Sequence, residues 1–199
     1  MQERIDAYFS TLACLIRGTQ VTDRAGTPLS LAQGFVRVRD AARAAHDRGN
    51  KIMFIGNGGS AGIASHLAID FSKNGDLRSL AFNDPAALTC LGNDFGFESV
   101  FARQVGCHAC PGDLLVAISS SGRSRNILQA ATAARERDCR VMTFSGFEED
   151  NDLRRLGEVN FYVHSREYGF VEVAHLSLCH AILDLEMGWG EAVAVSGTT

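Results

Sequence analysis

The chain has 199 residues, of which 46% are hydrophobic and 21% are charged, with 3 prolines against 20 glycines. This composition is that of an ordinary globular domain and excludes collagen-like and Pro-rich disordered chains. The net charge of −4 gives no sign of the basic face that nucleic acid requires, so we expect no nucleic-acid partner. We find no apolar stretch of about 20 residues, and the first ten residues lack the apolar segment of a signal peptide. We therefore expect a cytoplasmic protein without a membrane partner.

The six cysteines are expected to be thiols, because no secretion signal accompanies them. Cys107 and Cys110 have the CxxC spacing of a zinc knuckle or a redox pair. A second CxxC is missing, however, and Pro111 and Gly112 turn the chain directly into an apolar run. We interpret the pair as two cysteines on a surface-facing connection.

Two helices are predicted at the N-terminus. The first spans residues 3–17, and its apolar side chains form a single stripe at helical spacing: Ile5, Tyr8, Phe9, Leu12 and Ile16. A polar break follows from Gly18 to Pro28. Ser30 is a suitable N-cap for the second helix, which reaches about His46, and its arginines are interpreted as a solvated face. The stripe on the first helix predicts an oligomer.

From residue 51 onward, short apolar runs alternate with helical segments. The five runs are 51–56, 79–82, 113–119, 140–145 and 159–163. Helical spacing is clear over 124–137, and an apolar helix over about 170–187 closes the pattern. Continuous apolar strands that alternate with helices indicate a parallel sheet covered on both faces. The sequence therefore predicts an α/β fold, a three-layer doubly wound sandwich that is Rossmann-like or flavodoxin-like. Its sheet is mainly parallel and five-stranded, and the N-terminal helices are added to it.

Two of the predicted strands end in loops that suit a small anion. The first loop is Gly56-Asn57-Gly58-Gly59-Ser60, and the second is Ser119-Ser120-Ser121-Gly122-Arg123-Ser124. Ligands of open α/β sheets bind at the carboxyl ends of strands, against helix N-termini. Neither loop fits GxGxxG or a Walker sequence. The serine-rich loop suits one phosphate monoester, while turn chemistry with an N-cap remains an alternative for either loop alone.

Ionisable side chains form a second pattern on two of the predicted helices. His66 and Asp70 are spaced i, i+4 and therefore share a helix face. On the closing helix, Glu172 lies about 80° from His180 around the axis and about 60° from His175 on the other side. Glu172 can therefore share a site with either histidine, but the two histidines hardly share one. Two histidines and two carboxylates could form a tetrahedral metal site, and a satisfied core histidine is the alternative for His66.

Taken together, these motifs resemble the sugar isomerase (SIS) family and, within it, the phosphoheptose isomerases. The resemblance is carried by Gly56-Asn-Gly-Gly-Ser-Ala61 with His66, Leu91-Gly-Asn-Asp-Phe-Gly96, Ala117-Ile-Ser-Ser-Ser-Gly-Arg-Ser124 and the segment from Glu172 to His180. It implies an N-terminal helical oligomerisation segment (1–49) and an SIS sugar-phosphate-binding domain (50–190). From the small and polar residues of its sequence, the segment 191–199 is predicted to be a flexible tail.

The resemblance also implies an activity. It points to an enzyme, an aldose–ketose isomerase that converts sedoheptulose 7-phosphate into D-glycero-D-manno-heptose 7-phosphate for lipopolysaccharide and other surface polysaccharides. It implies one Zn²⁺, or another divalent metal, per subunit. The partner is then a phosphorylated seven-carbon sugar, bound at intersubunit active sites of a homotetramer.

Site residues follow from the resemblance position by position. The substrate-binding positions would be Asn57, Gly58, Gly59, Ser60, Asp70, Asn93, Asp94, Ser119, Ser120, Ser121, Ser124 and Glu172. The metal positions would be His66, Asp70, Glu172 and His180. Asp70 and His180 would be the catalytic pair that transfers protons.

Three departures from the family pattern accompany this resemblance. Asp70 stands where the family usually has glutamate, and Glu172 stands where it usually has glutamine. A usual aspartate is missing near Tyr168. Other readings are an isomerase of another sugar phosphate, a non-catalytic SIS protein that binds a replication initiator, and a sugar-phosphate sensor. An adaptor would not need to keep four ionisable side chains at the site.

Overall fold

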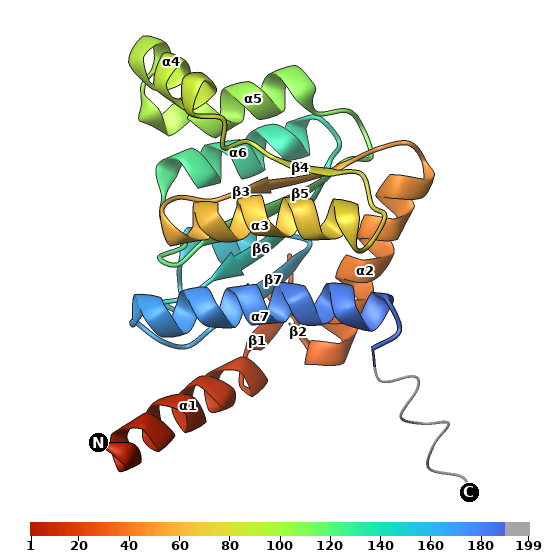
Figure 1. The fold of residues 1–199 in the computed structure, drawn as a ribbon. Coiled ribbons are helices and arrows are strands. Elements are labelled where there is room, and N and C mark those ends of the chain that lie inside the picture. Colours follow the sequence, from red (N-terminus) through yellow and green to blue (C-terminus); the bar gives the residue numbers. More distant parts are fainter. Residues whose placement is uncertain (190–199) are drawn as a thin grey trace, which may run out of the picture.

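The computed structural model describes residues 1–189, and its centre is a seven-stranded sheet flanked by helices (Figure 1). The strand order is β2-β1-β7-β6-β5-β3-β4. The strands are β1 (Gln20–Asp23), β2 (Pro28–Leu29), β3 (Ile52–Ile55), β4 (Ser79–Ala81), β5 (Leu114–Ser119), β6 (Arg140–Ser145) and β7 (Val159–Tyr162). The five strands from β3 to β7 are parallel to one another and coincide with the five predicted apolar runs. Their spatial order is that of a flavodoxin-like doubly wound sheet, which confirms the predicted fold class.

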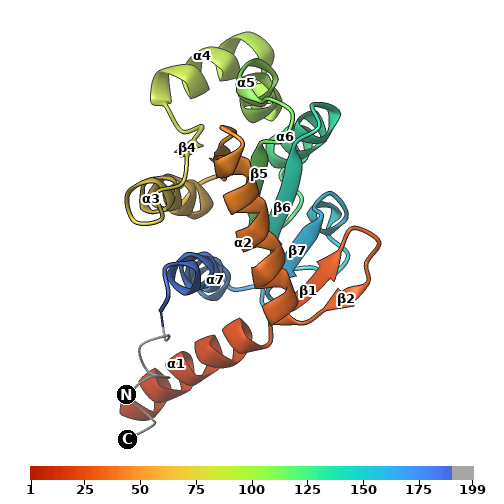
Figure 2. The ribbon, with the colours of Figure 1, turned by 90° about the vertical axis from the view of Figure 1, so that its right-hand side faces the viewer.

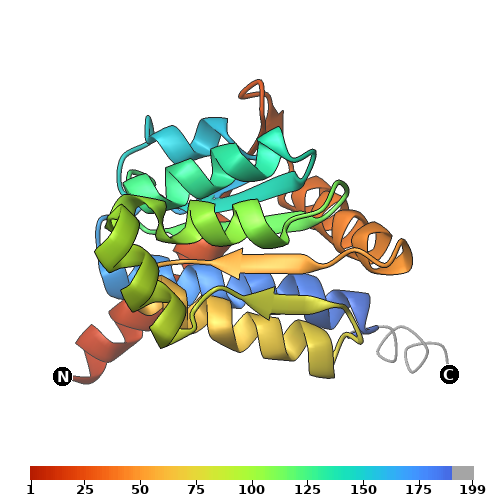
Figure 3. The same cartoon turned by 90° about the horizontal axis from the view of Figure 1, so that it is seen from above.

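The helices lie in two layers. They are α1 (Gln2–Arg17), α2 (Leu31–Asp47), α3 (Gly59–Lys73), α4 (Pro85–Phe95), α5 (Val100–His108), α6 (Arg125–Glu136) and α7 (Tyr168–Glu186). Figures 2 and 3 show α3 and α7 on one side of the sheet and α6 on the other. The predicted N-cap of α2 is present as a capping box, in which Ser30 and Gln33 each satisfy the other's backbone N–H.

Alternating side chains on the buried strands fill the two interfaces between sheet and helices. On β3, Ile52 and Phe54 pack with α2, α3 and α7, whereas Met53 and Ile55 pack with α5 and α6. Successive residues of a strand point to opposite faces, so a strand buried on both sides is apolar throughout. This is why the apolar runs identified the strands of the parallel sheet.

The polar stretch after α1 is a β-hairpin, which the sequence did not predict. β1 pairs antiparallel with β7 through Gln20 and Tyr162, and β2 closes the edge of the sheet. Only Val21 of this hairpin is buried. A short edge ribbon with one buried side chain has no apolar run to reveal it.

Helix α1 projects away from the body of the molecule (Figures 1 and 2). None of its side chains is fully buried, although Tyr8 packs on Phe170 of α7 with ring centroids 4.5 Å apart. The predicted tail, residues 191–199, lies outside the described residues. Among the described helices, none combines the length and the apolar character needed to cross a membrane.

Candidate active site

The glycine loop and the serine loop meet at the carboxyl edge of the parallel sheet. β3 leads through the first loop into α3, and the neighbouring strand β5 leads through the second loop into α6. Because α3 and α6 pack on opposite faces of the sheet, the two connections diverge and leave a crevice between them. This switch point is where doubly wound folds bind their ligands.

A cavity of about 310 Å³ occupies this crevice. It is lined by Asn57, Gly58, Gly59, Ser60, Ser119, Ser120, Ser121, Ser124, Tyr168 and Glu172. All the loop residues that we predicted to bind substrate therefore surround one space. Tyr168 was not among the predicted site residues, although its place in the first turn of an apolar helix was visible in the sequence.

The serine loop presents hydroxyl groups to this cavity. The Ser119 hydroxyl lies 3.4 Å from that of Ser124, and Ser120 Oγ is buried without a hydrogen-bond partner among the described residues. Gly122 adopts a φ of +61°, and a Cβ there would collide with the Asn151 side chain. The loop is therefore held in a tight turn at the N-terminus of α6, where hydroxyl and free backbone N–H groups suit an anion.

A pair of amides fixes the glycine loop to α6. Asn57 Nδ2 donates to Asn126 Oδ1 at 2.9 Å, and Asn126 Nδ2 donates to Asn57 Oδ1 at the same distance. Asn126 is buried in the first turn of α6. This reciprocal pair ties the glycine loop to the helix that follows the serine loop, and we did not identify Asn126 from the sequence.

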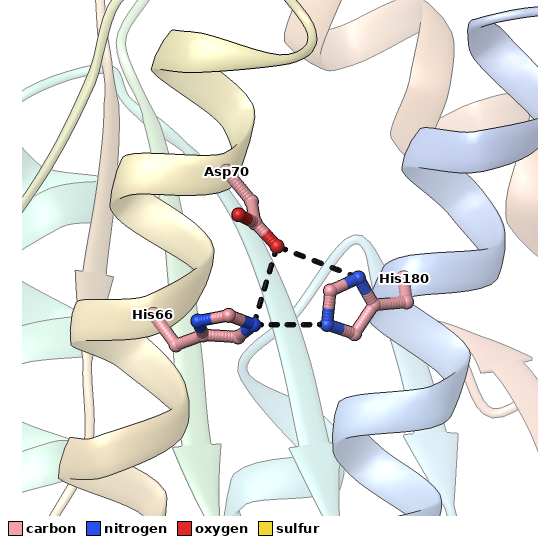
Figure 4. Close-up of side chains that lie close together, drawn as sticks. All are labelled: His66, Asp70 and His180. Carbon is pink, nitrogen blue, oxygen red and sulfur yellow. Dashed lines mark hydrogen bonds and ion pairs between the residues drawn. The ribbon is translucent and has the colours of Figure 1, made fainter.

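Three ionisable side chains converge between α3 and α7 (Figure 4). His66 Nε2 lies 3.2 Å from Asp70 Oδ2 and 3.1 Å from His180 Nε2. His180 Nδ1 lies 3.6 Å from the same carboxylate oxygen. Two imidazoles and a carboxylate whose ligand atoms lie within 4.8 Å of one another fit a divalent metal with a coordination position left open.

Glu172 is not part of this three-residue cluster in the single chain, so its place among the four predicted metal ligands stays a prediction. Its carboxylate lies against Gly59, where any Cβ would collide with it, and it lines the cavity. Glu172 and His180 do share a sector of α7, as predicted. Eight residues, however, separate them by about 12 Å along the helix axis. The angular argument omitted this height difference.

The remaining predicted positions lie elsewhere. Asn93 and Asp94 are exposed on α4, where Asn93 donates to Asp94 at 2.9 Å, and neither lines the cavity. Asp70 lies in the cluster rather than in the cavity wall. Arg123 is half exposed and pairs with Asp150 at 2.8 Å.

His175 is separate from both groups. It is completely buried, and its Nε2 lies 3.0 Å from the Ser145 carbonyl oxygen. Burial lowers the pKa of this imidazole to about 4, although the hydrogen bond to Ser145 opposes the shift. The two histidines of α7 therefore have different surroundings, as the helix geometry predicted. Cys107 and Cys110 are exposed free thiols.

Comparison with known proteins gives one consistent family. The SIS domain model matches residues 30–146. The phosphoheptose isomerase of Citrifermentans bemidjiense is 35% identical over 71% of this chain and 76% of its own length. That of Rhodospirillum rubrum is 34% identical over 93% of this chain and 96% of its own length.

A solved structure agrees with these sequence matches. The phosphoheptose isomerase GmhA from Neisseria gonorrhoeae superposes with a TM-score of 0.80 at 31% identity, covering 93% of this chain and 98% of that one. The shared fold extends over almost the whole of both chains. The chain therefore belongs to the SIS domain family and, within it, to the phosphoheptose isomerases, a family of aldose–ketose isomerases.

Proposed function

We propose that this protein isomerises sedoheptulose 7-phosphate to D-glycero-D-manno-heptose 7-phosphate. One observation carries the proposal: the serine loop, which suits a phosphate, lines the same cavity as the Glu172 carboxylate. The two helices that contribute to this cavity, α3 and α7, also carry the His–Asp–His cluster. The product would supply heptose for lipopolysaccharide and other surface polysaccharides. Because a sugar phosphate is charged and does not cross a membrane unaided, we assign the reaction to the cytoplasm.

The reaction needs a proton acceptor and an anchor for the substrate. Isomerisation removes a proton from the carbon next to a carbonyl, forms an enediolate, and returns a proton to the neighbouring carbon. The serine loop would hold the phosphate, far from the reacting carbons, and so fix the position of the sugar chain. The Asn57–Asn126 pair would keep the glycine loop at a constant distance from that anchor.

We propose that His66, Asp70 and His180 hold one divalent metal per subunit, with Zn²⁺ favoured by two imidazoles and one carboxylate. A bound cation would supply Lewis-acid stabilisation of a developing oxyanion. Asp70 and His180 also remain candidates for moving protons among the substrate oxygens.

We further propose a homotetramer with active sites between subunits. The exposed apolar stripe of α1 supports an assembly, since Ile5 and Phe9 face solvent in the single chain. In such an assembly, Asn93 and Asp94 of a neighbouring subunit would complete the sugar site that the single chain leaves without them.

The phosphate assignment is tested by calorimetric titration with sedoheptulose 7-phosphate. Ser121→Ala combined with Ser124→Ala should weaken binding at least tenfold, because two hydroxyl contacts to a charged group are lost. Circular dichroism should show an unchanged fold. Thr132→Ala on the outer face of α6 is a matched control that should bind as the wild type does. Unchanged affinity in the serine variant would reject the phosphate site.

An isomerase of another pentose or heptose phosphate is the second candidate. It is favoured by Asp70 and Glu172, which alter the length of one acidic side chain and the charge of another position relative to the family pattern. Turnover of a panel of pentose, hexose and heptose phosphates decides between the two. A pure binding protein is disfavoured, because binding alone does not require the clustered His66, Asp70 and His180.

A further inference from the structure

We propose that the Arg123 guanidinium binds the phosphate of the substrate, and that the Asp150 carboxylate competes with that phosphate for it. The inference rests on the proposed function and deepens it, since it adds a cationic side chain to the phosphate site. It is carried by the charge of the cavity wall and by the place of Arg123 in the serine loop.

The cavity has no positively charged side chain in its wall. Among the described residues, no lysine, arginine or histidine lines it, and its one charged lining residue is the acidic Glu172. A phosphate monoester carries a charge of about −1.5 to −2 at neutral pH. Serine hydroxyls and the N-terminus of α6 favour an anion, but together they supply less than one full positive charge. We therefore expect a cation close to the cavity to complete the site.

Arg123 is the residue placed to supply this charge. It stands in the serine loop between Ser121 and Ser124, which both line the cavity. Its backbone N–H donates to Ser121 Oγ at 3.2 Å, whereas its Nη2 lies 2.8 Å from Asp150 Oδ1, outside the cavity wall. A long side chain attached at this point can turn from the carboxylate toward a phosphate held by the serine loop.

The ion pair with Asp150 is one that a phosphate can replace. The Arg123 and Asp150 side chains are 52% and 76% exposed, and ion pairs between exposed side chains contribute little to stability. A phosphate offers more negative charge than one carboxylate and accepts two parallel N–H bonds from a guanidinium. The guanidinium should therefore leave Asp150 when the substrate binds.

The backbone around this pair is already fixed, so the exchange requires only side-chain rotation. Gly146 N donates to the Ser120 carbonyl oxygen at 2.9 Å, and Leu153 N donates to the Gly122 carbonyl oxygen at 3.1 Å. These two bonds hold both ends of the segment that carries Asp150 against the serine loop. Asp150 is thus kept close to the phosphate site whether or not it holds the guanidinium.

Calorimetric titration with sedoheptulose 7-phosphate at several salt concentrations tests the role of Arg123. Arg123→Gln should weaken binding about tenfold, because a charge-assisted contact to the phosphate is lost. Its affinity should also fall less steeply with added salt than that of the wild type, because one attractive charge is missing. Arg123→Lys keeps the charge but not the paired donors, so its affinity should lie between the two.

Asp150→Asn tests the competition. Removing the carboxylate frees the guanidinium, so the affinity should rise about two- to threefold, in line with the small contribution of an exposed ion pair. In the Arg123→Gln background the same change should leave the affinity unaltered, because Asp150 acts through Arg123. An equal gain in both backgrounds, or no gain in either, would overturn the proposed exchange.

Arg125→Gln is the matched control. Arg125 lies in the first turn of α6, pairs with Glu98 at 2.9 Å and does not line the cavity. Its loss removes the same charge from a nearby exposed position and should change the affinity by less than about twofold. An Arg123→Gln protein that binds as tightly as the wild type would overturn the role of Arg123 alone. A wild-type protein that binds no sugar phosphate would instead reject the proposed function, and the role of Arg123 with it.

Discussion

At the scale of single residues, burial separates the chemistry of neighbouring side chains on α7. His175 is enclosed by the core and donates to the Ser145 carbonyl, while its Nδ1 is buried without a partner among the described residues. His180, five residues later, is partly exposed and meets His66 and Asp70. The same residue type thus supports the end of β6 in one case and a candidate metal site in the other.

The low pKa of His175, about 4, makes stability depend on pH. Between pH 6.5 and 4, the unfolded chain binds a proton at this residue that the folded protein does not bind. The free energy of unfolding therefore has its full value above pH 6.5 and falls as the pH is lowered, by about 2 kcal/mol between pH 7 and 5.

Denaturant titrations at the two pH values check this expectation. His175→Gln keeps a donor for the Ser145 carbonyl but cannot titrate, so its stability should fall less over the same range. An equal loss in wild type and variant would show that His175 does not cause the pH dependence.

Residue positions were predictable where spacing alone decides them. The i, i+4 spacing of His66 and Asp70 predicted that they share a helix face, and their side chains are in contact. The loops that follow two of the apolar runs were predicted to bind an anion, and their serines and glycines line the cavity. Asn126 and Tyr168 were not predicted, because their roles depend on tertiary contacts. Asn126 pairs with Asn57 of the glycine loop, and Tyr168 lines the cavity.

At the scale of elements, the site depends on how α3 and α7 lie side by side on one face of the sheet. His66 and Asp70 come from α3, and His180 comes from α7 (Figure 4). A helical wheel gives the direction of a side chain but not its height along the axis. For this reason it correctly separated His175 from His180 but did not show how far Glu172 lies along α7 from the His66–Asp70–His180 cluster.

We expect purified protein to contain about one divalent metal per chain. His66→Ala should lose it, because only two of the three clustered ligands remain, and metal affinity then falls by orders of magnitude. Elemental analysis of protein prepared without chelator checks the metal content. His164→Ala is the control, since that exposed histidine lies outside the cluster. A metal-free wild type would contradict the assignment.

At the scale of the whole molecule, the parallel sheet was predictable and its edge was not. Fully buried strands can be recognised in the sequence as apolar runs. The β1–β2 hairpin has no such run, because its position is set by the pairing of β1 with β7. The chain also leaves apolar surface uncovered. α1 carries an exposed stripe, and a groove of about 470 Å³ between α2 and α7 is lined mainly by aliphatic and aromatic side chains.

If the protein assembles through the apolar stripe of α1, charged residues introduced into that stripe should weaken the oligomer. Ile5 and Phe9 are 41% and 61% exposed and lie one turn apart. Replacing both with lysine should weaken the oligomer strongly, since burying each side chain contributes about 1.5–3 kcal/mol. Light scattering at micromolar concentration should show smaller species. Ser10→Lys, which adds charge at an exposed polar position of the same helix, should leave the assembly intact. A monomeric wild type would refute the proposed tetramer.

The most direct test of the proposed isomerisation is proton-exchange NMR with sedoheptulose 7-phosphate in D₂O, with and without added zinc. The account predicts deuterium at the carbon next to the carbonyl, together with an aldose 7-phosphate product. Binding of the sugar phosphate without any exchange or aldose would contradict it, because the cavity would then recognise the ligand without performing the reaction.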